Sequence, residues 1–95
     1  MLFFVLDMTI FVKTVGETFE IKVNRFDRIM EVKTKIQELK DIQPRLQKLF
    51  FRPLSSKTYI ALEDERSLSS YFIKHKSTLP LVVGNNKLQY EVFFS

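Results

Sequence analysis

Hydrophobic and polar residues alternate with a period of two near the start of the chain, in two runs separated by a short polar stretch that contains Gly16. The first run, MTIFVKT, places Ile10 and Val12 on one face of an extended chain. The second run, TFEIKV, does the same with Ile21 and Val23. Because side chains of a strand alternate between the two faces of a sheet, this pattern predicts a β-hairpin with one buried face.

A helical period follows, in the stretch IMEVKTKIQELK. Its apolar residues recur every three or four positions, and they are Ile29, Val32, Ile36 and Leu39. This spacing predicts an amphipathic helix with one apolar stripe. Asp27 suits an N-terminal cap or a first-turn acid, and Lys40 suits the last turn. Asp41 stands where many helices close on a glycine, so we expect a left-handed residue there with strain of about 1 kcal/mol.

The rest of the chain contains shorter signals. The predicted elements are a third strand at QKLFF, a short strand at residues 59–62, a helical turn at residues 67–71, a strong strand at TLPLVV and a further strand at residues 87–94. In the helical turn we expect Ser67 as the cap, with Leu68 and Tyr71 pointing inward. Strands and one helix in this order predict an α+β domain.

Several of these segments resemble ubiquitin in their residues as well as in their order. MTIFVKT is similar to the opening of ubiquitin, IMEVKTKIQELKDIQP to its helix, QKLFF to its third strand and KSTLPLVV to its final strand. LEDERSLSSYFI resembles the family segment Leu-Glu-Asp-Gly-Arg-Thr-Leu-Ser-Asp-Tyr-Asn-Ile. The resemblance covers residues 8–84 and implies a β-grasp fold, in which a mixed β-sheet of four to five strands packs on one α-helix. Residues 1–7 are then an apolar N-terminal extension, and residues 85–95 a C-terminal extension.

Glycine usage separates this chain from the conjugated members of that family. Ubiquitin ends in an exposed Gly-Gly tail, because the tail must enter a narrow channel of the activating enzyme. This chain has only Gly16 and Gly84, and bulky residues such as Leu88 and Tyr90 follow Gly84. We therefore expect a chain that is not conjugated to other proteins.

The resemblance also implies a binding surface, which is a shallow apolar patch on the sheet. The patch residues are Val15, Phe50, Pro80 and Val82, and the basic residues around them are Lys13, Lys48 and Arg52. An apolar centre with a basic rim suits an amphipathic helix that carries acidic flanks. The alternative is that these are ordinary half-buried strand residues, because scattered exposed apolar side chains are normal.

Two further features follow from the resemblance. Lys33 and Asp64 are expected to form a partly buried ion pair between the helix and a charged turn. The stretch Leu54–Ala61 is longer than the corresponding turn of the family. This longer stretch is either a loop insertion that the fold tolerates or an insertion that changes the shape of the neighbouring patch.

Composition narrows the range of functions. At 95 residues the chain is one small domain, and it has no cysteine, so it has neither disulfides nor a thiolate site. The net charge of +4 comes from interspersed charges rather than a basic stripe, which argues against nucleic-acid binding. The apolar stretch MLFFVL is too short to span a membrane or serve as a signal peptide. We expect a cytoplasmic or nuclear protein.

The chain offers no recognisable catalytic chemistry. His75 is the only histidine, and its position between two lysines predicts a solvated surface residue. There is no glycine-rich phosphate loop and no metal-ligand spacing, and no serine has an evident base beside it. We therefore expect no catalytic residues, no cofactor and no metal, and hence no enzyme.

Two functional hypotheses remain. The first is a non-catalytic interaction module that docks on ubiquitin receptors or the proteasome through the apolar patch. The second is a structural or assembly domain that associates with itself through its Phe-rich terminal segments, because an added strand rich in apolar residues favours edge-to-edge pairing.

Overall fold

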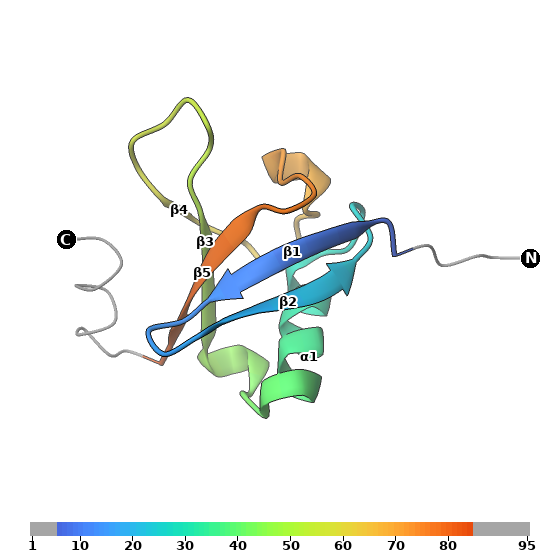
Figure 1. Ribbon diagram of the computed structural model, residues 1–95, viewed down its shortest axis with the longest axis vertical. Coiled ribbons are helices and arrows are strands. Elements are labelled where there is room, and N and C mark those ends of the chain that lie inside the picture. Colours follow the sequence, from blue (N-terminus) through green and yellow to red (C-terminus); the bar gives the residue numbers. More distant parts are fainter. Residues whose placement is uncertain (1–5, 85–95) are drawn as a thin grey trace, which may run out of the picture.

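The computed structural model describes residues 6–84, in which one helix packs on one face of a five-stranded mixed sheet (Figure 1). The strands are β1 (Met8–Lys13), β2 (Thr18–Val23), β3 (Gln47–Phe51), β4 (Ile60–Ala61) and β5 (Thr78–Val83). The helix is α1 (Ile29–Lys40), and two 3₁₀ turns are η1 (Pro44–Leu46) and η2 (Ser69–Tyr71). The predicted α+β β-grasp fold is confirmed, and the short fourth strand and the helical turn lie where they were expected.

The strand order is β2-β1-β5-β3-β4, so the N-terminal strand pairs with the last described strand at the centre of the sheet. The pair β1–β5 is parallel, while β1–β2, β3–β5 and β3–β4 are antiparallel. A parallel pair needs a long connection that crosses one face of the sheet. Residues 14–77 make that connection here, and they include α1, which covers one face of the sheet.

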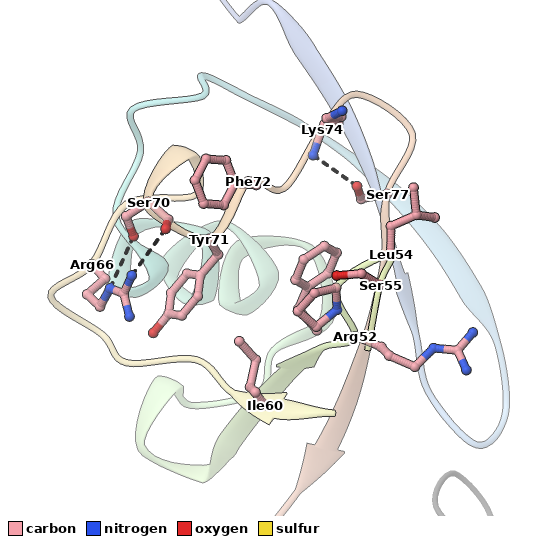
Figure 2. A pocket seen from close by; sticks show the side chains of 12 residues that line it. Arg52, Leu54, Ser55, Ile60, Arg66, Ser70, Tyr71, Phe72, Lys74 and Ser77 are labelled. Atoms are coloured by element: carbon pink, nitrogen blue, oxygen red, sulfur yellow. Dashed lines mark hydrogen bonds between the residues drawn. The ribbon is translucent and has the colours of Figure 1, made fainter. Parts of the chain in front are cut away.

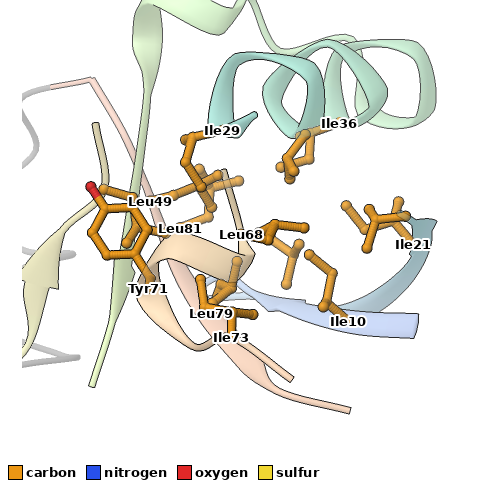
Figure 3. Close-up of a cluster of buried hydrophobic side chains, with 14 of the residues drawn as sticks. Ile10, Ile21, Ile29, Ile36, Leu49, Leu68, Tyr71, Ile73, Leu79 and Leu81 are labelled. Carbon is orange, nitrogen blue, oxygen red and sulfur yellow. The ribbon is translucent and has the colours of Figure 1, made fainter. Parts of the chain in front are cut away.

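The hydrophobic core lies between α1 and the sheet. Ile29 and Ile36 on the helix point toward Leu68 and toward the strands that carry Ile10 and Leu81 (Figure 3). These five side chains have no exposed surface. The inward pointing of Leu68 confirms the expectation for the helical turn, where Ser67 Oγ also accepts a bond of 3.2 Å from the backbone N–H of Ser70.

The helix has the predicted bounds, but two details of the prediction are wrong. Arg28, not Asp27, is the N-cap, and its backbone N–H donates to Glu31 Oε1 over 3.2 Å. Leu39 is 57% exposed rather than part of the apolar stripe. Leu39 sits in the last turn of the helix, beyond the buried residues Ile29, Val32 and Ile36 that pack in the core.

Beyond the helix, Asp41 adopts the expected left-handed conformation, with φ 57°, and its backbone N–H donates to Gln37 O over 2.8 Å. The expected ion pair is also present, because Lys33 Nζ lies 2.5 Å from Asp64 Oδ1. The Lys33 side chain is only 9% exposed, whereas that of Asp64 is 42% exposed. The pair therefore anchors a buried cation of α1 to the loop that precedes η2.

Gln47 is a buried polar residue at the start of β3. Its Nε2 donates to Lys33 O and to Ile42 O, each over 2.9 Å. These bonds tie the first residue of the strand to the helix and to its exit. The two terminal extensions and the strand predicted at residues 87–94 lie outside the described residues.

Candidate protein-binding site

The tip of the β1–β2 hairpin presents Val15. Thr14 organises the turn, since its backbone N–H donates to Glu17 O over 2.8 Å and its Oγ1 accepts from the N–H of Glu17 over 3.0 Å. Val15 is left pointing outward and is 53% exposed. A turn closed by its own hydrogen bonds holds this apolar side chain in place without burying it.

The remaining predicted site residues come from β1, β5 and β3, which are neighbours in the sheet. Lys13 lies opposite Pro80 in the β1–β5 register, and Lys48 lies opposite Val82 in the β3–β5 register. Phe50 follows on β3, two residues from Lys48 and on the same face. The structure thus brings the sequence-predicted residues to one face of three adjacent strands.

Exposure across this face is uneven. Val82 has no exposed surface and Pro80 is buried, whereas Phe50 is half-buried. The expectation of an exposed apolar patch is therefore wrong for Pro80 and Val82. Both lie on β5, whereas Val15 stands at the hairpin turn and Phe50 lies on β3 next to the two-residue strand β4.

The rim of this face is basic. Lys13, Lys48 and Arg52 are all exposed. The guanidinium of Arg52 lies over the ring of Tyr59, 5.7 Å from its centroid. Exposed Val15 and half-buried Phe50 thus belong to a face whose predicted rim residues are cationic and exposed.

A sequence model of the Ubiquitin family matches residues 10–86, which is more than half of the chain. The chain belongs to the ubiquitin family. This finding confirms the resemblance in the strands and the helix, and it supports a role in protein interaction in general.

The single histidine of the ubiquitin-like domain lies at the surface and makes a hydrogen bond to the sheet. His75 is exposed, but its Nδ1 accepts a hydrogen bond of 3.0 Å from the backbone N–H of Thr9. The predicted surface position is confirmed, and folding adds this bond because it brings the turn before β5 against β1. The two residues are 66 positions apart, so no local pattern could indicate this contact.

Asp7 precedes β1 and contacts the loop after β2 of the ubiquitin-like domain. Arg25 donates to it twice, from Nε over 2.8 Å and from its backbone N–H over 3.2 Å. Desolvation raises the pKa of the Asp7 carboxyl, but the bonds and the charge of Arg25 outweigh this effect and hold the pKa below its ordinary value.

Two structural features are absent from the described part of the domain. Residues 6–84 contain no group of three or more His, Cys, Asp or Glu side chains placed to hold a metal ion. Within the same residues, no helix is long and apolar enough to cross a membrane.

Sequence reasoning missed an apolar groove on the ubiquitin-like domain. It has a volume of about 950 Å³ and lies between the loop that joins β3 to β4 and the segment around η2 (Figure 2). Phe51, Ile60, Tyr71 and Phe72 supply most of its apolar lining. One signal was present in the sequence, because Phe72 stands where the matching family segment has an asparagine.

Proposed function

We propose that this domain is a non-conjugated, non-catalytic interaction module that docks on ubiquitin receptors, including those of the proteasome. The observation that carries the proposal is the convergence of an apolar pair, Val15 and Phe50, with a basic rim on the sheet face that α1 leaves uncovered. Family membership supports a role in protein interaction, and the geometry of this face suggests the kind of partner.

The chemistry of the face favours an amphipathic helix with acidic flanks. Phe50 is a large aromatic side chain and can act as an anchor, since aromatic residues are enriched among the dominant contacts of interfaces. Lys13, Lys48 and Arg52 would pair with acidic residues on either side of the partner's apolar stripe. Pro80 and Val82 are buried, so they would support the shape of the binding face rather than contact the partner directly.

Non-conjugation rests on the absence of a Gly-Gly pair in the sequence. A module of this kind would act by binding alone, in the cytoplasm or the nucleus, where ubiquitin receptors are found. No catalytic residue, cofactor or metal is needed for it.

An amide NMR titration of the isotope-labelled 95-residue chain with an acidic, ubiquitin-interacting helical peptide tests the proposal. We expect shifts centred on Val15 and Phe50, and a loss of affinity of about tenfold or more in Phe50→Ala. Leu39→Ala is the matched control, because it removes an exposed apolar side chain from α1, away from this face.

An unchanged affinity in Phe50→Ala would reject the sheet face as the docking site. A chain that dimerises, and loses its dimer when residues 88–95 are deleted, would instead support the assembly hypothesis. Sedimentation of the full-length and truncated chains separates these two outcomes.

A further inference from the structure

The apolar groove beside η2 is built from residues that are distant in sequence. Tyr71 forms its floor and is only 6% exposed, while Phe51 and Ile60 meet as register partners in the β3–β4 pair. Phe72 and Leu54 stand at the rim with most of their surface in water, at 80% and 104% exposure. Figure 2 shows Leu54, Ile60, Tyr71 and Phe72 around one hollow, which Phe51 also lines.

Hydrogen bonds of the inserted loop hold one wall of the groove. The backbone N–H of Ser56 donates to Pro53 O over 2.9 Å, and Ser56 Oγ accepts from the N–H of Thr58 over 3.1 Å. These bonds fold the loop into a turn that precedes β4. A wall with its own hydrogen bonds needs little further ordering when a partner binds.

The opposite wall is fixed by Arg66. Its guanidinium lies over the Tyr71 ring at 4.0 Å from the centroid, and it donates to Ser70 Oγ and Ser70 O over 3.2 and 3.1 Å. The Tyr71 hydroxyl accepts from the backbone N–H of Glu63 over 2.8 Å. The floor of the groove is thus locked in position.

Phe72 is unusual in both its conformation and its exposure. Its φ of 61° lies in the left-handed region, which disfavours residues with a bulky side chain. Packing does not offset this cost, because the ring is 80% exposed. The left-handed conformation follows from its place as the C-cap of η2, so it is the exposed aromatic ring beside an apolar hollow that points to a ligand.

The charges of the groove indicate what that ligand carries. The charged residues that line it, Arg52, Arg66 and Lys74, are all cationic. Within residues 6–84, Arg66 has Glu63 at 4.0 Å, whereas neither Arg52 nor Lys74 has an ion-pair partner. Two cations thus stand at an apolar hollow with no acidic side chain to neutralise them.

We propose that this groove binds an acidic peptide segment of a partner protein, with one large apolar side chain of the peptide inserted between Phe72 and Ile60. Charge complementarity with Arg52 and Lys74 selects the acidic partner, and the apolar walls select its anchor. The groove differs from the sheet face, because Phe51 and Phe50 alternate on β3 and point to opposite sides, and the two surfaces meet at Arg52. The domain therefore has a second interface, created by its loop insertion.

The test is a display library of random twelve-residue peptides, selected on the 95-residue chain and counter-selected on Phe72→Asn. Asparagine tolerates the left-handed conformation, so this variant removes the ring without straining the fold. We expect the recovered peptides to share an aromatic or long aliphatic residue flanked by Asp and Glu. Their affinity should fall about tenfold in Phe72→Asn and severalfold in Lys74→Glu.

Lys76→Glu is the matched control, because it reverses the charge of an exposed lysine two positions from Lys74 that does not line the groove. Equal losses in Lys74→Glu and Lys76→Glu would overturn the proposed contact. So would peptides without acidic enrichment, peptides that bind Phe72→Asn equally well, or a wild-type dimer that Phe72→Asn dissociates. Peptides that depend on Phe50 instead of Phe72 would support the sheet-face site and reject the groove.

Discussion

Asp41 offers a direct test of how α1 is terminated. Its φ of 57° places an L-residue in the left-handed region, and its carboxylate follows the last turn of a helix. Across the described chain, this side chain makes neither an ion pair nor a hydrogen bond that could offset either cost. Replacing Asp41 should therefore reveal two separate penalties, one steric and one electrostatic.

The magnitudes follow from the geometry. The left-handed conformation costs a residue with a Cβ roughly 1–2 kcal/mol, and less for Asp than for most. A negative charge at a helix C-terminus is unfavourable by about 0.3–1 kcal/mol at low salt. Glycine removes both penalties but loses about 0.5–1 kcal/mol to the entropy of the unfolded chain. We expect Asp41→Gly to raise the free energy of unfolding by about 0.5–1 kcal/mol.

Two matched variants separate the contributions. Asp41→Asn keeps a residue that tolerates the left-handed region and removes only the charge, so it should gain about 0.5 kcal/mol. Asp41→Ala loses that tolerance and should be the least stable of the three variants. Guanidinium chloride adds salt, so urea unfolding followed by circular dichroism at 222 nm measures all four chains.

Salt distinguishes the two penalties further. At about 1 M NaCl the Debye length falls to about 3 Å, so the gain of Asp41→Asn should disappear while part of the gain of Asp41→Gly persists. An Asp41→Gly chain no more stable than the wild type at low salt would refute the reasoning. It would mean that the left-handed conformation costs aspartate nothing at this position.

Two other predictions concern the ion pairs. Asp64→Asn should lower the free energy of unfolding more than Lys33→Met does, by about 1 kcal/mol or more, because Asp64→Asn leaves the buried Lys33 ammonium without its anion whereas Lys33→Met removes the ammonium. Urea unfolding of both variants measures this difference. A Lys33→Met chain less stable than the Asp64→Asn chain would contradict the prediction. The bonds from Arg25 lower the pKa of Asp7, so their contribution to stability is present above the unfolded pKa of about 3.9 and is lost as the pH falls through the folded pKa. Arg25→Ala should raise the Asp7 pKa in an NMR titration of the carboxyl carbon, and an unchanged pKa would remove Arg25 as its cause.

Local periodicity was sufficient to identify the strands and the helix whose apolar residues recur at regular spacing and are buried on one side. The alternation at Ile10 and Val12 specified a strand, and the spacing of Ile29, Val32 and Ile36 specified a helix, because each period allows only one secondary structure to bury its apolar side. The pattern failed at Leu39, since periodicity identifies the stripe of a helix but not where the sheet beneath it ends.

The candidate site was only partly accessible from the sequence. The resemblance identified Val15, Phe50 and their basic neighbours, because these residues are read directly off matching segments. It could not indicate that Pro80 and Val82 are buried, since burial depends on the tertiary structure around β5 and not on the matching segments. The bond from Thr9 to His75 joins residues far apart in the chain and was equally invisible.

By itself, the sequence determined the order and type of the elements and the membership of the ubiquitin family, because these depend on short-range periods and on matching segments. Only the tertiary structure decided which side chains reach the surface. The exposure of Phe72 beside the hollow over Tyr71 arises where the β3–β4 loop meets the segment around η2. The solvent exposure of a side chain depends on which residues surround it in space. The parallel pairing of β1 with β5 brings together residues that are far apart in the sequence and that no local pattern connects.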